Sequence, residues 1–163
     1  MKLILSSLLL FALLGACSAP GASQTPTGGS SSPVLEPADA DLMAIAKAYT
    51  GYTALNQDLR VSPQHGGIYV RTHLDASAEK TFNAKSFPYA EGAVAVKEGH
   101  LSAEGAIDRI YIMKKLKAGY DVANGDWFYA VLSPEGAVRQ KGKEQLCIGC
   151  HQQAKSRDYV VGF

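Results

Sequence analysis

The sequence predicts an α+β domain in which a mainly antiparallel β-sheet is flanked by helices. Residues 68–72 alternate, with Ile68, Val70 and Thr72 on one face, and further segments of the middle of the chain are equally rich in strand formers. Turns rather than long helices join these segments, which favours antiparallel pairing. The predicted strands are residues 68–72, 93–98, 107–113, 127–132 and 137–140.

Helices are predicted on either side of these strands. Apolar residues of 41–49 recur at the spacing of one helical face, and Asp39 or Asp41 can cap that helix. Residues 76–85 form a second, short helix, and residues 144–154 form a C-terminal one.

Turn residues mark the connections between these elements. Asn124-Gly125 predicts a hairpin between two of the strands. The polar stretch 56–67, with Pro63 and Gly66-Gly67, is expected to be a loop.

The N-terminal residues have the composition of an export signal. The apolar run 3–14 is too short to span a bilayer as a mature anchor. Leu14-Gly15-Ala16-Cys17 resembles the bacterial lipobox, in which cleavage before Cys17 leaves its thiol to take a lipid. An ordinary signal peptide whose small residues precede a cysteine is the alternative interpretation. Residues 1–16 are therefore predicted to be a lipoprotein signal peptide.

The next residues predict a tether rather than folded structure. Residues 17–38 are mostly Ser, Thr, Gly, Pro and Ala, with few large apolar side chains to offset the entropy of ordering. Residues 39–163 have the length of one domain. We expect this domain in the periplasm of a bacterium, lipid-anchored to the inner or outer membrane through Cys17.

Charge and cysteine content narrow the function classes. The formal net charge is +1 and no basic run is present, so the sequence does not predict nucleic-acid binding. Of the three cysteines, one belongs to the lipobox. The other two are three residues apart, so no disulfide framework is expected.

The C-terminal region carries the most specific motif. Cys147-Ile148-Gly149-Cys150-His151 matches C-x-x-C-H, in which two thiols bond to a porphyrin and the adjacent imidazole binds its iron. A reactive dithiol would need a preceding βαβ unit, and a zinc site would need further ligands. The sequence therefore predicts one covalent haem c, with His151 as the iron ligand.

Further blocks of residues resemble a known family. They are Gly92–Glu98, Met113-Lys114, Gly125–Ala130, the late C-x-x-C-H and Asp158. In order and spacing these blocks are similar to the cytochrome P-460 and cytochrome c′-beta family. The resemblance implies an antiparallel sheet with flanking helices, a homodimer, and a five-coordinate haem c. It also implies an open iron side that binds nitric oxide or oxidises hydroxylamine.

Lys97 is the residue that divides these two activities. The resemblance aligns it with the lysine that cytochromes P-460 bond to the porphyrin edge. Alternation places Ala93, Ala95 and Lys97 on one strand face, where two small side chains leave room for a flat ring. A solvent-facing lysine on a half-exposed strand is the alternative.

The open side of the iron is defined less sharply by the sequence. On this side, family members have a carboxylate or a small residue from the stretch before the attachment motif. Glu144 is the only acid in that stretch and could transfer protons there. Alternatively, Glu144 is a solvated residue at the helix start. An apolar cap is the other possibility. The aromatic candidates for it are Phe87, Tyr89 and Tyr69.

Other side chains could in principle bind the iron as a sixth ligand. They are His65, His73, His100, Met43 and Met113. None is placed convincingly by its sequence context, so a vacant side is expected.

Two function classes follow from these residues. As a binding protein, the chain would bind nitric oxide or transfer electrons to a soluble redox partner. As an enzyme, it would oxidise hydroxylamine, with Lys97 tuning the ring and Glu144 moving protons. The first is the leading interpretation.

Overall fold

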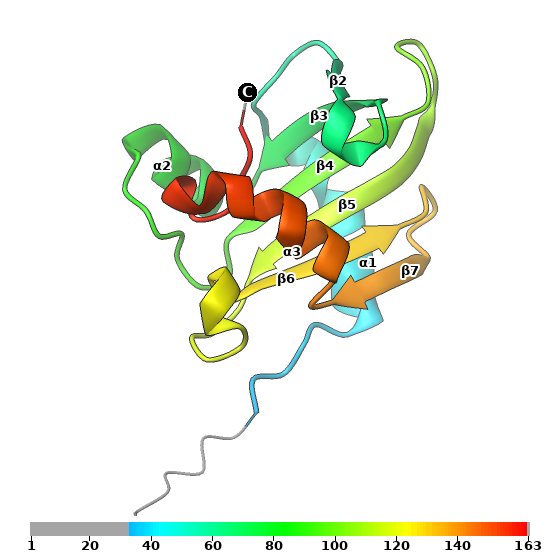
Figure 1. Cartoon of the computed structure of the whole chain (residues 1–163). Coiled ribbons are helices and arrows are strands. Elements are labelled where there is room, and N and C mark those ends of the chain that lie inside the picture. The colour runs from blue at the N-terminus through cyan, green and yellow to red at the C-terminus, as the bar shows by residue number, and fades with distance from the viewer. Residues whose placement is uncertain (1–32, 163) are drawn as a thin grey trace, which may run out of the picture. The chain divides into compact units, whose positions relative to one another are not determined.

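Seven strands form one antiparallel sheet at the centre of the fold (Figure 1). This computed structural model describes residues 33–162, so the predicted signal peptide, Cys17 and most of the predicted tether lie outside the described residues. The strand order is β1-β3-β4-β5-β6-β7, and β2 also pairs with β3. The strands are β1 Thr53–Ala54, β2 Arg60–Ser62, β3 Ile68–Leu74, β4 Val94–His100, β5 Ile107–Lys115, β6 Trp127–Leu132 and β7 Val138–Gly142.

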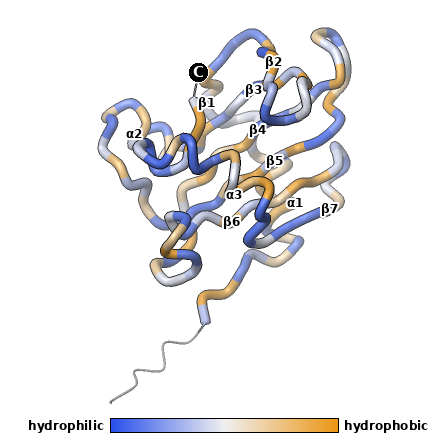
Figure 2. Tube along the Cα trace, viewed as in Figure 1, coloured by the Kyte–Doolittle hydropathy of each residue, from blue (hydrophilic) through white to orange (hydrophobic). Residues whose placement is uncertain are grey.

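The predicted α+β class is confirmed, and the five predicted strands are present. The prediction of a plain loop at 56–67 is wrong in part, because β2 and a 3₁₀ turn at Pro63–His65 lie within it. Backbone hydrogen bonds to β3 hold β2 at the sheet edge, and a polar sequence gives no sign of such pairing. The edge strand β7 is also hydrophilic over most of its length (Figure 2).

Helices cover both faces of the sheet. The helix α1 (Asp39–Ala48) lies behind it, and α3 (Gln145–His151) crosses in front (Figure 1). The Asp41 carboxylate accepts a hydrogen bond from the backbone N of Ala38, so Ala38 rather than Asp39 or Asp41 is the N-cap residue. The short helix α2 (Ala76–Ala84) begins at Asp75, whose carboxylate accepts from the backbone N of Ala78.

The two faces of the sheet build two separate cores. On the back face, Leu42 and Ile45 of α1 pack against Val94, Val96 and other strand residues. The front core surrounds α3 and the C-terminal segment. It contains Ala93, Ala95, Met113, Trp127, Tyr129, Ile148, Tyr159 and Val160. The predicted alternation along β4, with alanines on one face and valines on the other, is therefore confirmed.

The C-terminal helix is shorter than the predicted 144–154. It ends at His151 and tightens into a 3₁₀ segment at Gln152–Arg157. The predicted hairpin between β5 and β6 is present, but its connection is longer than a two-residue turn. It includes a 3₁₀ turn at Val122–Asn124 followed by Gly125. The φ of Gly125 is 69°, in the left-handed region that glycine adopts without steric cost. Within residues 33–162, no helix is long and apolar enough to cross a membrane.

Candidate functional site

The attachment motif lies on α3 with its functional side chains on one helical face. Cys147 and Cys150 are three residues apart, and Cys147 and His151 are four apart, which are the spacings of neighbours on a helix surface. Both thiols are partly buried and neither is in a disulfide. Ile148 anchors the helix in the front core, while Leu146 is 85% exposed. The motif residues therefore face inward, toward the sheet.

His151 is held in one tautomer by the backbone. Its Nδ1 lies 2.7 Å from the carbonyl oxygen of Tyr159. A carbonyl can only accept, so Nδ1 carries the proton and Nε2 presents a lone pair. Burial has the largest effect on the pKa of His151 and lowers it. The hydrogen bond to Tyr159 raises this pKa, and the charge of Lys97 lowers it further. A neutral imidazole of this kind is suited to bind a metal.

One row of side chains crosses the front face beside this histidine. The strand registers pair Thr72 with Lys97, Lys97 with Tyr111, Tyr111 with Val131, and Val131 with Gln140. Directly paired residues of antiparallel strands lie on the same face of a sheet. The pairing therefore brings together residues from five strands.

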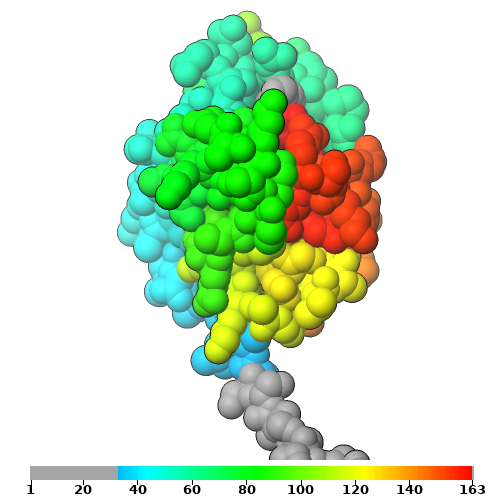
Figure 3. All heavy atoms as spheres, turned by 90° about the vertical axis from the view of Figure 1, so that its left-hand side faces the viewer, coloured from blue at the N-terminus to red at the C-terminus, as the bar shows by residue number. Residues whose placement is uncertain are grey.

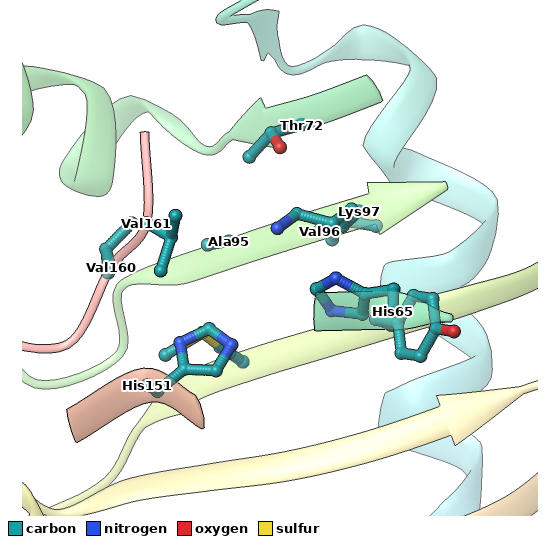
Figure 4. Close-up of a pocket in the computed structure, with 10 residues that line it drawn as sticks. His65, Thr72, Ala95, Val96, Lys97, His151, Val160 and Val161 are labelled. Carbon is teal, nitrogen blue, oxygen red and sulfur yellow. The ribbon is translucent and has the colours of Figure 1, made fainter. Parts of the chain in front are cut away.

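Three cavities adjoin this row and His151. Two have volumes of about 350 Å³ and 340 Å³, and both are lined by Gln64, His65, Cys150 and His151. The first also contacts Cys147, Tyr111, Tyr129 and Gln140; the second contacts Lys97, Val161 and Arg157. A smaller pocket of about 30 Å³ lies between His151, Lys97 and His65 (Figure 4). The larger volumes fall in the range of small-molecule and cofactor sites.

Lys97 is placed beside His151 rather than in solvent. It is 9% exposed, and Figure 4 shows its side chain at the pocket that Ala95, Val161 and His151 also line. Burial lowers the pKa of Lys97 from 10.5 to about 8. The solvent-facing alternative for this lysine is therefore wrong.

His65, one of the possible sixth ligands named from the sequence, lies at the site. It lines all three cavities, its ring meets that of Tyr111 edge-on at 4.7 Å, and its Nδ1 lies 2.7 Å from Ser62 Oγ. Burial first, and then the charges of Lys97 and His151, lower the pKa of His65 to about 3. The neutral imidazole therefore shares the pocket with His151.

Glu144 is placed at the start of α3 as its N-cap residue. It does not line any of the three cavities. From the stretch before the attachment motif, Gln140 lines the largest cavity instead. The difference arises because Gln140 shares the front face of the sheet, whereas Glu144 lies beyond the end of β7.

The three aromatic candidates for a cap are not brought together at the cavities. Tyr69 pairs with His100 and points to the back face, one residue out of phase with Val70 and Thr72. Phe87 and Tyr89 do lie on the front side, but Tyr89 packs edge-on against Trp127, with ring centroids 5.5 Å apart. None of the three lines a cavity around His151.

The other proposed iron ligands are mostly remote. His73 and His100 lie on the back face around Glu98, and Met43 is exposed on α1. Met113 alone of these four lines cavities near His151.

The Cys147 thiol does not resemble that of a redox-active dithiol. Burial is the main cause that raises the pKa of Cys147, whereas the reactive thiol of a redox-active dithiol has a low pKa.

The site residues have the chemistry of a c-type haem protein. A helix presents two unpaired thiols and a neutral imidazole to cavities over an antiparallel sheet, and unpartnered buried hydroxyls at Thr72 and Tyr129 line the same space. The fold and this site define a haem-binding domain. The sequence matches the family Cytochrome P460 over residues 46–161, and the chain belongs to that family. It is therefore a haem-binding cytochrome, and membership implies a c-type haem. Among curated proteins, none matches the chain.

Acid sensitivity is expected from His65. Its folded pKa of about 3 lies below its ordinary 6.5, so the unfolded chain takes up a proton first as the pH falls. Above pH 6.5, His65 is neutral in both states and does not lower the free energy of unfolding. Between pH 6.5 and pH 3, the free energy of unfolding falls as the pH falls. Between pH 7 and pH 5, wild type should lose about 2 kcal/mol more than His65→Gln. Denaturant unfolding at both pH values measures this, and parallel losses would contradict it.

Proposed function

We propose that this chain is a membrane-tethered, mono-haem c cytochrome whose open iron side binds nitric oxide or another small ligand. One observation carries the choice of ligand binding over oxidation. Among the described residues that line the three cavities around His151, none is an aspartate or a glutamate. Oxidation of hydroxylamine releases protons, and a site for it needs a group that accepts them at neutral pH.

The motif residues have fixed roles in this proposal. Cys147 and Cys150 would hold the porphyrin through thioether bonds, and the Nε2 of His151 would bind the iron. Arg157 lines one cavity and offers a cation for the carboxylates of the ring. When bound, a haem supplies a site for diatomic ligands and for one-electron transfer.

Neutral polar side chains line the largest of the three cavities, together with Arg109. Gln140, Tyr111 and Tyr129 line the largest cavity and can donate hydrogen bonds, and burial, the main cause, raises the pKa of Tyr129. The low pKa of His65 makes it a weak base. Such a lining can orient a ligand but has little capacity to remove protons, which supports binding. The aromatic cap of Phe87, Tyr89 and Tyr69 is not part of this proposal, because none of the three lines these cavities.

Hydroxylamine oxidation remains a second candidate because of Lys97. This lysine lines the pocket beside His151, and a pKa of about 8 leaves a fraction of its amine neutral near physiological pH. A neutral amine is the nucleophilic form that a bond to the porphyrin edge requires. Glu144, the acid expected to serve this reaction, lies outside the cavities.

The cellular setting is part of the same proposal. A lipid on Cys17 would anchor the domain at the inner or outer membrane, in the periplasm of a bacterium. Residues 18–32 of the predicted tether would link the two, since Val34 already packs on the back core and Glu36 accepts a hydrogen bond from the Tyr120 hydroxyl at 2.6 Å. In the periplasm, the domain would work as a homodimer that exchanges electrons with a soluble partner. Two points support this setting. The residues before Cys17 resemble a lipobox, and haem c is attached to proteins only after their export.

Haem retention tests the attachment chemistry. Cys147→Ala with Cys150→Ala should lose the haem on extraction with acidic acetone, because no thioether bond remains. Cys17→Ala is the matched control, since it removes a cysteine outside the motif and should retain the haem. Retention in the double variant would contradict covalent attachment.

Lipid attachment has its own test. A radiolabelled fatty acid should mark the wild type expressed in a host that processes lipoproteins, and should not mark Cys17→Ala. An unlabelled wild type would reduce residues 1–16 to a simple signal peptide.

The spectrum of the reduced protein decides between the two functions. We expect a high-spin, five-coordinate ferrous protein that binds nitric oxide. A low-spin, six-coordinate ferrous spectrum would contradict the vacant side and would make His65 or Met113, which line cavities with His151, the candidate sixth ligands. Lys97→Ala should leave the five-coordinate spectrum and nitric oxide binding nearly unchanged. The control is Lys114→Ala, because Lys114 pairs with Val94 and lies on the back face, away from His151. Loss of a red-shifted band and of hydroxylamine turnover in Lys97→Ala alone would establish the enzyme instead.

A further inference from the structure

The segment that contacts His151 has an unusual backbone. Asp158 and Tyr159 are consecutive non-glycine residues with φ values of 49° and 69°. Side-chain-bearing residues rarely adopt this left-handed region, and two in succession are rarer still. The carbonyl of Tyr159 nevertheless accepts the hydrogen bond from His151 Nδ1. Other contacts must therefore hold this turn in place.

Asp158 supplies most of those contacts. Its Oδ2 accepts hydrogen bonds from Lys115 Nζ at 2.5 Å and from the backbone N of Tyr89 at 2.9 Å. Its backbone carbonyl accepts from Trp127 Nε1 at 2.8 Å. One residue thus ties the C-terminal turn to β5, β6 and the loop that precedes β4.

Lys115 is itself held in position by the sheet. It pairs with Trp127 across β5 and β6, and its Nζ lies 5.1 Å from the centroid of the Trp127 ring. Lys115 and Asp158 are both buried, and Trp127 is fully buried. A buried ion pair is weak evidence for stability, since an apolar pair of similar volume often serves as well. A geometric role explains why charged groups occupy this position.

Tyr159 is locked from the other side. Its hydroxyl donates to the carbonyl of Ala123 at 3.1 Å, and its ring packs on Gly125, where an added Cβ would lie 2.5 Å from the ring. Figure 3 shows the red C-terminal segment side by side with the green segment of α2 and the yellow segment before β6. The turn is therefore enclosed by chain on both sides.

We propose that Lys115 and Asp158 are positioning residues that hold the Tyr159 carbonyl against His151 and so set the donor strength of this histidine toward iron. The inference rests on the proposed role of His151 as the iron ligand. A hydrogen bond to the second nitrogen of a ligating histidine fixes its tautomer and orientation and raises its basicity. A more basic ligand stabilises ferric over ferrous iron.

Loosening this turn should therefore have two measurable effects. In Asp158→Asn, which keeps the side-chain size but removes the charge, the carbonyl of Tyr159 should move away from Nδ1. The iron–histidine stretching band of the ferrous protein should shift to lower frequency, and the reduction potential should rise. Lys115→Met should shift both quantities in the same direction as Asp158→Asn. Lys115→Arg keeps the positive charge and should give values closer to those of the wild type.

One control separates positioning from general stability. Lys141→Met breaks an exposed ion pair with Asp39, with the two atoms 2.7 Å apart, that lies away from His151. Thermal unfolding is measured for every variant, and this control should leave the stretching band and the potential unshifted.

The outcomes are distinct. If Asp158→Asn and Lys115→Met unfold at lower temperature but keep the wild-type band and potential, the pair is only structural and the inference is overturned. If Asp158→Asn does not fold, Lys115→Met and Lys115→Arg decide by the same readouts. A wild type without covalent haem overturns the proposed function, and the inference with it. A normal haem c protein with unshifted variants overturns the inference alone.

Discussion

The hydrogen bond from His151 Nδ1 to the Tyr159 carbonyl is the constraint on which the site depends. It joins the helix that carries the cysteines to the last residues of the chain. Through Asp158, those residues are tied to β5, β6 and the loop before β4. The imidazole tautomer is thus set by contacts that span much of the domain, which is why a short motif can present this imidazole in a defined orientation.

The alternation of side chains along β4 separates two electrostatic environments by a single residue. Lys97 faces the front cavities, where burial lowers its pKa to about 8. Glu98 faces the back, and although burial alone would raise it, contacts with His73, then Tyr49 and His100, lower the pKa of Glu98 to about 2. Arg71 completes this group at 3.1 Å from the carboxylate. Burial therefore disfavours the charged form of Lys97, whereas hydrogen bonds and nearby charges favour the charged form of Glu98, one residue away.

Much of the fold was predictable because its signals are local. Period-two alternation predicted the strands, and the i, i+3, i+4 spacing of Leu42, Ile45 and Ala46 predicted α1. The edge strand β2 was missed, because the hydrogen bonds that form it come from β3. At the site, alternation placed Lys97 on the same face as Ala95. It could not show that Tyr111 and Gln140 join the same row, because their register with β4 depends on every intervening strand.

The sequence by itself determined that Cys147, Cys150 and His151 lie together, since they are neighbours on a helix wherever that helix lies. Only the tertiary structure decided what faces them. It placed His65 and Gln140 at the cavities and kept Glu144, Tyr69, Phe87 and Tyr89 away from them. The physical reason is that spacing fixes which side chains share an element's face, whereas contacts between distant segments depend on strand register and on how the helices pack across the sheet.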